Sequence, residues 1–477
     1  MRITTAGDLA ALAGGELRGD AACPVGPEVV VDARLAAAGS VFVAIPGERV
    51  DGHDFADQAV EHGAAAIIAT RPTGADLAHV IVDDSVAGLG RLASGLVRRA
   101  VGEGLVVLAI TGSSGKTSTK DLLAQVLEHD GPTVSPVGSF NNEIGVPLTA
   151  CQVDERTRYL VSEMGARGIG HLRWLTGLIP PTISLVLNVG SAHLGEFGSV
   201  ENIAIAKGEL VEALAPGGWA VLNADDHRVA AMASRTRGRI AWFTRGADPL
   251  PGELVMRALD VVPDDLQRHS FRLVVERTGV PREEHPVRLR LIGVHQVHNA
   301  IAAAAAAVAA GMDPRAVAEA LSAAGPRSKW RMQLDERADG AAVLNDAYNA
   351  NPESMAAALA TLAELGRSRR AVDPTARTVA VLGDMLELGD DAASAHERVG
   401  RLAGELGIDE VIAVGDHADR IVAGVLSGGG AAREQVGSEV AGRIALGPMD
   451  VVLVKASRGM ALERVAEQIL LEGGRSC

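Results

Sequence analysis

One short segment of the chain places glycines, a lysine and hydroxyl side chains between an apolar run and an amphipathic stretch. Its residues are Thr111, Gly112, Ser113, Ser114, Gly115, Lys116, Thr117 and Ser118. The preceding run, Leu105–Ile110, is typical of a buried strand, and a helix is predicted to begin near Lys120. In this order the glycines let backbone N–H groups face an anion, and the helix N-terminus adds partial positive charge. The segment predicts a loop that binds a nucleoside triphosphate, with Lys116 at the β- and γ-phosphates and Thr117 as a ligand of Mg²⁺.

Three further residues could act at the same site. Glu163 follows the apolar run Tyr159–Val161, and its carboxylate is a suitable oxygen ligand for Mg²⁺. His193 stands just past the run Ile183–Leu187, and Lys207 lies in a stretch with helical periodicity. Taken alone, such a Glu or His is more often structural, and most lysines face solvent. The structural and the functional interpretation of each residue therefore both stay open at this point.

The elements that must position these residues indicate a three-domain α/β fold, because 477 residues exceed one ordinary core. Residues 1–102 are predicted to form a small α/β domain, and residues 103–325 a doubly wound P-loop domain with a small antiparallel sheet. Residues 326–477 are predicted to form a Rossmann-like domain. Gly102-Glu-Gly104 and Gly325-Pro326 mark the boundaries, and we expect hinges near them. The predicted strands are the apolar runs Val41–Ile45, Ala65–Ala69, Val80–Val82, Leu105–Ile110, Tyr159–Val161, Ile183–Leu187, Trp219–Leu222, Ile240–Phe243, Ala342–Leu344, Thr378–Leu382, Glu410–Val414 and Val451–Val454.

Composition excludes several classes of function. The net charge of −15 argues against a nucleic-acid-binding scaffold, which needs basic patches. The three cysteines, Cys23, Cys151 and Cys477, match no metal-binding spacing and are too few for a disulfide framework. Neither a signal peptide nor a membrane-spanning run is visible. We therefore expect a cytoplasmic protein without a membrane span, acting as a monomer.

Several tracts in register resemble the Mur ligase family. The shortened form of the phosphate loop, in which Ile110 replaces the first glycine of the longer form, is similar to that of this family and of folylpolyglutamate synthetase. The other tracts are Phe140–Pro147, Ser162–Gly165, Asn188–His193, Ile205–Leu210, His295–Asn299, Asp346–Pro352, Leu382–Gly389 and Lys455–Arg458. Phe140–Pro147 and the last three are similar to the branch of the family that adds D-alanyl-D-alanine. The Asp-Asn-Pro-Arg tetrapeptide usual in the sister branch that adds the third residue is missing.

The resemblance implies an ATP- and Mg²⁺-dependent ligase that joins D-alanyl-D-alanine to UDP-N-acetylmuramoyl-tripeptide through an acyl phosphate. It implies catalytic roles for Lys116, Glu163, His193 and Lys207, and metal ligation by Thr117, Glu163, His193 and a carbamylated Lys207. The nucleotide would also contact Asn299, Arg331 and Asp346. The substrates would contact Asp32, Arg34, Asn141, Asn142, Asn349, Asn351, Ser457 and Arg458. The family often has Ser or Thr between the residues matching Asp32 and Arg34, where this chain has Ala33.

Alternatives remain for single residues and for the whole chain. Asn299 could instead cap the Ala-rich helix that contains Ala300–Ala310, and Arg458 could form an ordinary surface salt bridge. Another Mur ligase or a folylpolyglutamate synthetase is the nearest alternative enzyme. A GTPase would carry an Asn-Lys-x-Asp motif, which is not present. A non-catalytic nucleotide-binding regulator would have no reason to keep the catalytic set together.

Overall fold

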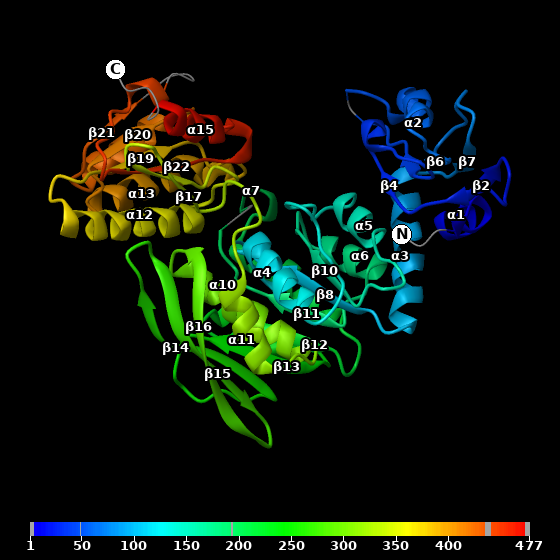
Figure 1. Ribbon diagram of the computed structural model, residues 1–477, viewed down its shortest axis with the longest axis horizontal. Helices are drawn as coiled ribbons and strands as arrows, with labels where there is room; N and C mark the ends of the chain where they lie inside the picture. Colours follow the sequence, from blue (N-terminus) through cyan, green and yellow to red (C-terminus); the bar gives the residue numbers. More distant parts are fainter. Residues whose placement is uncertain (1–3, 48, 192–193, 435–439, 473–477) are drawn as a thin grey trace.

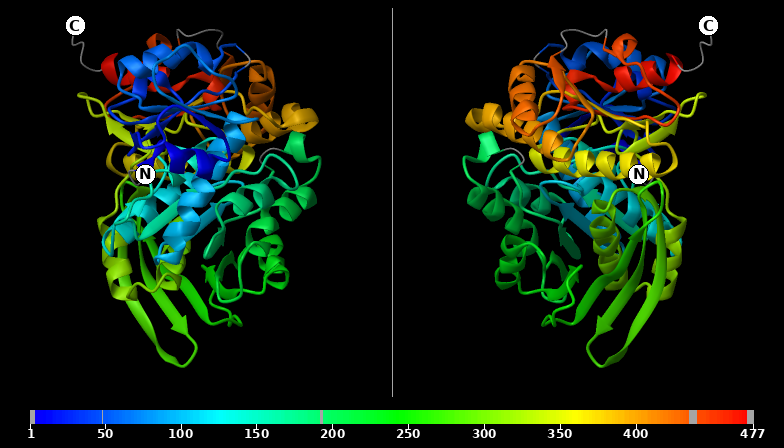
Figure 2. Two further views of the ribbon diagram at one scale, coloured as in Figure 1. Left: turned by 90° about the vertical axis from the view of Figure 1, so that its right-hand side faces the viewer. Right: turned by 90° about the vertical axis from the view of Figure 1, so that its left-hand side faces the viewer.

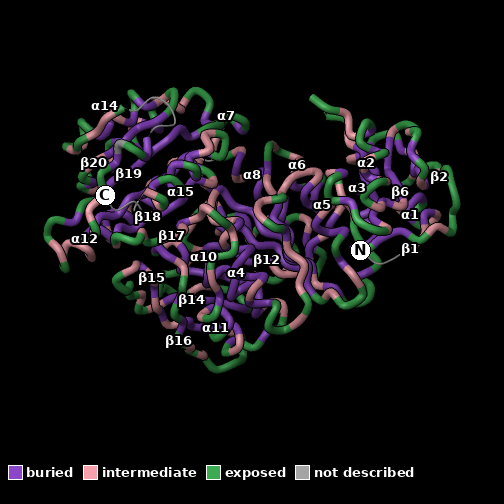
Figure 3. The backbone as a smooth tube through the Cα atoms, turned by 45° about the horizontal axis from the view of Figure 1, so that its top comes forward, coloured by how far each residue is buried: buried purple, intermediate pink, exposed green. Residues whose placement is uncertain are grey.

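The computed structural model describes residues 4–47, 49–191, 194–434 and 440–472, which form three α/β domains. Figure 1 shows the first and last domains above a larger central one, and the side views of Figure 2 agree. The strands of the sheets are mostly buried, whereas many of the connections are exposed (Figure 3). Across the described residues, no helix has both the length and the apolar character that crossing a membrane requires.

The N-terminal domain is built on a five-stranded sheet that is parallel except for its first strand. Its order is β2 (Glu16–Arg18), β7 (Ala78–Ile81), β6 (Ala66–Ala69), β5 (Val41–Val43) and β4 (Val29–Val30). Two short strands, β1 (Thr4–Thr5) and β3 (Pro24–Val25), form a separate antiparallel pair. The helices are α1 (Ala6–Ala13), α2 (Ala56–Glu61) and α3 (Ser85–Gly102). The three apolar runs predicted as strands in this region lie in β5, β6 and β7.

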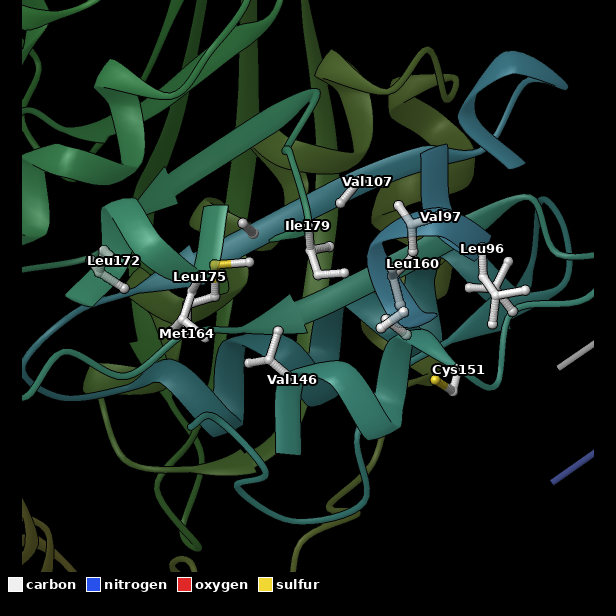
Figure 4. Close-up of a cluster of buried hydrophobic side chains, with 14 of the residues drawn as sticks. Leu96, Val97, Val107, Val146, Cys151, Leu160, Met164, Leu172, Leu175 and Ile179 are labelled. Carbon is white, nitrogen blue, oxygen red and sulfur yellow. The ribbon is translucent and has the colours of Figure 1, made fainter. Parts of the chain in front are cut away.

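Helix α3 joins the first two domains through a shared apolar core. One side of it packs against α1, and the other packs against α5 (Gly145–Ala150) and α6 (His171–Leu178) of the central domain. Figure 4 shows Leu96 and Val97 of α3 among side chains of the central domain, including Leu160 and Ile179. Because these residues are buried in one cluster, the junction near residue 102 is held by packing as well as by the chain.

The central domain contains a nine-stranded sheet. Its order is β16 (Val280–Ile292), β15 (Arg268–Arg277), β14 (Leu254–Pro263), β13 (Arg239–Thr244), β12 (Trp219–Asn223), β11 (Ile183–Val186), β8 (Val106–Thr111), β10 (Tyr159–Glu163) and β9 (Thr133–Val134). The strands from β13 to β9 are parallel, as the unbroken apolar runs predict. The antiparallel strands β14–β16 are also found, but β14 pairs with β13, so they extend the central sheet instead of forming a separate one.

Helices cover both faces of this sheet. The principal ones are α4 (Lys116–Glu128), α5, α6, α8 (Val200–Glu212), α10 (His295–Ala309) and α11 (Pro314–Ala323), with the short α7 (Leu194–Phe197) and α9 (His227–Ala231) between them. The Ala-rich α10 packs closely on α4 and crosses β13 and β14, because its small side chains let the backbones approach. The structure therefore holds α4, which begins at the phosphate loop, beside α10 on one face of the sheet.

The C-terminal domain has a six-stranded sheet in the order β17 (Gln333–Glu336), β18 (Ala342–Asn345), β22 (Val451–Lys455), β19 (Thr378–Leu382), β20 (Glu410–Ala413) and β21 (Ala432–Glu434). Only β17 runs antiparallel to its neighbour. Helices α12 (Pro352–Val372), α13 (Ala392–Glu405) and α14 (Ala418–Ser427) share a core on one face, and α15 (Glu463–Glu472) packs on the other.

The connection between the central and C-terminal domains is fastened to α4. Gln125 donates to Gly325 O (2.9 Å) and accepts from Gly325 N (3.1 Å). Ser328 Oγ donates to Asp121 Oδ2 (2.6 Å), and Arg327 pairs with Glu128 (2.7 Å). We call residues 325–328 the fastened linker.

Directly beyond the fastened linker, Trp330 (φ 58°) and Met332 (φ 49°) both adopt the left-handed conformation that side chains disfavour. The Gly325-Pro326 pair is therefore hydrogen-bonded to the central domain, and the unusual backbone conformations follow after residue 328.

Candidate active site

A cavity of about 760 Å³ lies between the central and C-terminal domains. It brings together most of the residues predicted to contact nucleotide, metal or substrates. These are Ser113, Ser114, Gly115, Lys116, Thr117, Ser118, Asn141, Asn142, Glu163, Lys207, Asn299, Arg331, Asp346, Asn349, Asn351 and Arg458. Thr111 is buried at the end of β8 with Gly112 beside it, and neither lines the cavity. The predicted residues therefore converge on one space from two domains.

The phosphate loop is held in shape by its own backbone and by the neighbouring strand end. Ser113 N donates to Asn188 O (3.1 Å), and Ser114 N donates to Asn188 Oδ1 (2.9 Å). Helix α4 begins at Lys116, four residues earlier than predicted, because the loop residues already adopt helical geometry. Gly115 precedes it at φ 78°, and a side chain there would collide with Asn299 Oδ1 at 2.6 Å. Only glycine fits this position, and α4 directs its N-terminus at the cavity.

Thr117 lies at the centre of a chain of polar contacts that crosses the domain junction. Its hydroxyl lies 2.7 Å from Ser139 Oγ, which accepts a hydrogen bond from Arg331 Nη2 (2.9 Å). The Arg331 guanidinium also stacks 4.0 Å from the centre of the Tyr348 ring. Ser139 was not among the predicted residues, and only its place just before the Asn141-Asn142 tract could have suggested it. The contacts place Arg331 beside the phosphate loop.

Glu163 ends β10 and is buried, with 1% of its surface exposed. Its Oε1 accepts from Asn141 Nδ2 (2.9 Å), and its Oε2 has no partner among the described residues. Asn142, in contrast, accepts from Gly145 N (2.9 Å) at the start of α5. The two adjacent asparagines thus have different surroundings, and an unpartnered carboxylate oxygen is left at the cavity.

Lys116 and Lys207 bring positive charge into a buried environment. Lys207 lies on α8 with 4% of its surface exposed, so it is not the solvent-facing helix residue of the structural interpretation. Burial lowers its pKa well below the ordinary 10.5, and the charge of Lys116 lowers it further. Burial also lowers the pKa of Lys116, while the charge of Glu163 opposes this shift. The Lys116 ammonium donates to Gly112 O (2.6 Å), and the described residues provide Lys207 with no hydrogen-bond or ion-pair partner.

Asn299 is not a helix cap, because α10 begins at His295 and Asn299 lies within its first turns. Its Nδ2 donates to Gln296 Oε1 (2.9 Å), and its Oδ1 approaches Gly115 of the phosphate loop. Burial lowers the pKa of His295 to about 4, which keeps this ring neutral near pH 7. His298 is paired with Asp225 (3.1 Å). Of the two interpretations of Asn299, the position beside the nucleotide loop remains.

The residues that the C-terminal domain contributes to the cavity form hydrogen bonds and ion pairs within that domain. Asp346 accepts from Met332 N (2.9 Å) and from the buried Lys455 (2.5 Å), whose ammonium also donates to Asn349 O (2.9 Å). Asn351 caps α12 by accepting from Ser354 N (2.8 Å).

The last two residues of this predicted set also have partners within the domain. Ser457 is buried, does not line the cavity, and accepts from Leu386 N (2.9 Å). Arg458 forms the predicted salt bridge, with Glu463 at 2.6 Å, and its guanidinium lies over Trp330. It also lines the cavity, so the salt bridge and a ligand contact are both compatible with its position.

A second contact between the domains lies beside the phosphate loop. Ser191 N and Ser191 Oγ both donate to Glu353 Oε1, at 2.7 and 2.8 Å. Gly190 N donates to Ser113 Oγ of the phosphate loop (2.9 Å). Glu353 therefore binds Ser191, the residue directly after one that contacts the loop. His193, predicted from the same tract, lies outside the described residues. Glu353 was missed because its partners are 162 residues away in the sequence.

Asp32 and Arg34 lie on the N-terminal domain and do not line the cavity. Asp32 caps a short 3₁₀ helix, Ala33–Leu35, and its carboxylate pairs with Arg34 Nη2 at 2.6 Å. The Arg34 side chain is 75% exposed. These two residues therefore lie at the surface of a separate domain, away from the cavity.

Comparison with known proteins follows the same division of the chain. Family models match it as the catalytic domain of the Mur ligase family (residues 28–94), the Mur ligase middle domain (110–307) and the Mur ligase glutamate ligase domain (330–458). The UDP-N-acetylmuramoyl-tripeptide–D-alanyl-D-alanine ligase of Mycobacterium tuberculosis (strain ATCC 25618 / H37Rv) is 40% identical, over 93% of this chain and 92% of its own.

Solved structures agree. MurF from Acinetobacter baumannii superposes with a TM-score of 0.83 at 29% identity, covering 99% of both chains. MurF ligase from Thermotoga maritima in complex with ADP has a TM-score of 0.75 at 28% identity, covering 94% of this chain and 97% of its own. The cavity, the three domains and these matches together show that the chain belongs to the Mur ligase family of ATP-dependent, amide-bond-forming ligases.

Proposed function

We propose that the chain joins D-alanyl-D-alanine to UDP-N-acetylmuramoyl-tripeptide with cleavage of ATP, giving the UDP-linked pentapeptide, ADP and phosphate. The observation that carries this proposal is the cavity between two domains. One wall holds the partly buried Lys116 and the buried Lys207, neither with a carboxylate partner among the described residues, and the other offers polar groups at Asn349 and Arg458. A triphosphate and a second substrate can therefore meet in one space. The names of the relatives support the choice of substrates.

The reaction takes place in two steps. A carboxylate oxygen of the tripeptide attacks the γ-phosphorus of ATP, which forms an acyl phosphate and releases ADP. The amine of D-alanyl-D-alanine then attacks the carbonyl carbon, loses a proton and displaces phosphate. Such chemistry depends on neutralising phosphoryl charge and on positioning more than on a protein nucleophile.

Residues of the central wall supply that charge and position. Lys116 holds the β- and γ-phosphates, residues 111–118 and the N-terminus of α4 add N–H donors, and Arg331 reaches the phosphates from the domain junction. We assign Asn299, whose Oδ1 lies beside Gly115, a position near the adenine base. Asp346 orders the Arg331 segment through Met332 N.

We assign the substrate contacts by position. Asn349, Asn351, Ser457 and Arg458 belong to the wall that receives the dipeptide, where Arg458 can hold its carboxylate. Asn141 and Asn142 face the peptide of the UDP substrate, and Asp32 and Arg34 its sugar-nucleotide end. We place the domain boundaries at residues 102 and 325, with Arg327 and Ser328 of the fastened linker still bound to the central domain. Because the reaction consumes ATP, we also propose that it takes place in the cytoplasm.

The residues at the cavity fit a bound Mg²⁺. Glu163 Oε2 is a buried oxygen without a partner among the described residues, and Thr117 lines the same cavity. Oxygen groups of this kind are the ligands that Mg²⁺ prefers. When bound, Mg²⁺ neutralises phosphate charge, and Thr117, Glu163 and His193 would hold it.

Lys207 would contribute to the metal site as a carbamate. Its lowered pKa favours the neutral amine, the form that adds to CO₂ with formation of an N–C bond and loss of a proton. The product is an anion where the unmodified side chain is a cation. A mass spectrum of the intact chain kept in bicarbonate tests this, since the modification adds one CO₂ that Lys207→Ala cannot carry.

The substrate assignment is tested by offering ATP, Mg²⁺ and UDP-N-acetylmuramoyl-tripeptide together with D-alanyl-D-alanine, a single amino acid or glutamate in parallel. We expect rapid ADP release and a UDP-linked pentapeptide with the dipeptide alone. The UDP-linked dipeptide substrate should react poorly, because positioning errors of about 1 Å can slow a reaction roughly hundred-fold. Efficient use of a single amino acid would overturn the proposal and make the chain another member of the family.

A further inference from the structure

The carboxylate of Glu163 is held from one side only. Oε1 accepts from Asn141 Nδ2 at 2.9 Å, while Oε2 is buried and has no partner in the described part of the chain. A carboxylate with one oxygen fixed cannot rotate freely, so its second oxygen keeps one direction. The donor is a neutral amide, which orients the carboxylate without cancelling its charge.

Asn141 is itself anchored to the strand end that carries Glu163. Its carbonyl accepts from Gly165 N at 2.8 Å, two residues beyond Glu163. A side chain at Gly165 would lie 3.0 Å from Asn141 Oδ1, tighter than an ordinary contact, so glycine favours this close approach. Backbone and side chain of Asn141 thus bind the same strand end, and the amide has little freedom to turn elsewhere.

The neighbours of Asn141 have separate tasks. Ser139, two residues earlier, contacts the Thr117 hydroxyl, and Asn142 caps the start of α5 through Gly145 N. Residues 139–142 therefore connect the Thr117 hydroxyl with the Glu163 carboxylate. Among them, Asn141 contacts Glu163 and Ser139 contacts Thr117, which separates their effects in an experiment.

We propose that Asn141 is a positioning residue that fixes the Glu163 carboxylate so that Oε2 faces the divalent cation of the nucleotide. This inference rests on the proposed function, because it requires the cation to bind at Glu163. For Asn141 it replaces the direct substrate contact that the sequence implied and that the proposed function assigned. Outer partners of metal ligands commonly change metal affinity by about 10–100-fold when removed.

The test is the Mg²⁺ dependence of ADP binding by the full-length protein, measured by calorimetry over a series of MgCl₂ concentrations. For Asn141→Ala we expect the Mg²⁺ concentration of half-maximal effect to rise by about ten-fold or more. The half-saturating Mg²⁺ concentration for turnover should rise in parallel, with most of the rate restored at high Mg²⁺. If Asn141→Ala does not fold, the similarly shaped Asn141→Leu tests the same loss of the amide donor.

Asn142→Ala is the matched control. It removes the cap of α5, so its melting temperature should fall, while the Mg²⁺ midpoint of ADP binding, measured without the peptide substrate, stays at the wild-type value. An unchanged midpoint in Asn141→Ala would overturn the inference and return Asn141 to a substrate contact or a purely structural role. Glu163→Gln distinguishes the two levels of the argument. If its midpoint is also unchanged, the metal role of Glu163 in the proposed function fails; if only Glu163→Gln shifts, the Asn141 inference alone fails.

Discussion

The two walls of the cavity both contain buried lysines, but they treat the charge differently. In the central domain, Lys116 contacts a single backbone carbonyl and Lys207 has no ion-pair partner in the described structure. In the C-terminal domain, Lys455 is 1% exposed and pairs with Asp346. Leaving a buried cation without a carboxylate is costly, so it persists where an anion will bind. The central wall therefore keeps the charge of Lys116 for the ligand, while the C-terminal wall uses Lys455 to hold its own structure.

Helix α4 repeats this contrast within one element. Lys116 begins the helix and faces the cavity, whereas Lys120, one turn later, is buried against Asp121 (2.5 Å) and Pro136 O (2.7 Å). Lysine therefore has two roles on this helix. Beside a carboxylate, Lys120 stabilises the fold, and without one, Lys116 presents its charge to the cavity. The comparison predicts that replacing paired lysines lowers stability, and that replacing unpaired ones lowers activity.

The largest expected effect is on stability. Lys455→Ala should destabilise the C-terminal domain by about 3–5 kcal/mol, because it leaves the Asp346 carboxylate buried without its cation. Urea unfolding of the variant measures this loss. The double variant Lys455→Ala with Asp346→Ala should recover part of it. If Lys455→Ala were as stable as the wild type, the pair with Asp346 would not stabilise the domain, and this half of the comparison would be wrong.

Lys116→Ala should slow ligation by about hundred-fold or more while leaving the unfolding curve unchanged, because the lost charge acts on the phosphates. Steady-state release of phosphate gives the rate. Lys120→Ala, on the same helix, is the matched control: its unfolding midpoint should fall. Near-normal turnover in Lys116→Ala would mean that this loop is not the ATP site.

Lys207 predicts a dependence of stability on pH. Its folded pKa lies below the ordinary 10.5 because of burial, so between these two values the unfolded chain binds more protons than the folded one. The free energy of unfolding should therefore rise with pH through that window, relative to Lys207→Ala. Denaturant titrations in bicarbonate-free buffer compare the two proteins. Parallel pH profiles would contradict an unmodified, buried amine.

The smallest effect concerns the fastened linker, which ties one wall to the other. Gln125→Ala removes both hydrogen bonds to Gly325 and should lower stability by about 1–2 kcal/mol. Thermal unfolding measures the change, and Gln468→Ala, at an exposed position of α15, provides a comparison with little expected effect. A loss no greater than in that comparison would show that the linker is not held through Gln125.

Features that depend on local sequence were predictable. Each apolar run predicted as a strand overlaps a strand of the structure, and the phosphate loop lies between β8 and α4 as its motif requires. The start of α4 was placed too late, because loop residues with Gly and Ser already continue the helix at Lys116. The capping role considered for Asn299 was wrong because α10 starts at His295, where the sequence offers no usual cap.

Contacts between distant segments were not predictable from the sequence. The pairs Asn141–Glu163, Ser191–Glu353 and Asp346–Lys455 join residues 22, 162 and 109 positions apart. Each depends on which strand ends the fold brings together and on the rotamers chosen there. Periodicity and composition describe which residues face a core, but they carry no information about such partners.

The fastened linker also decides where this chain can be divided and rejoined. A chimera that takes its C-terminal domain from another family member would, by the apparent boundary, be joined at Gly325-Pro326. That junction would separate α4 from Arg327 and Ser328, which belong structurally to the central domain. Joining after Ser328 keeps these contacts native and leaves Trp330 and Met332, with their left-handed backbone, to the incoming domain. For protein engineering, the segment that should be kept together with α4 therefore ends at residue 328.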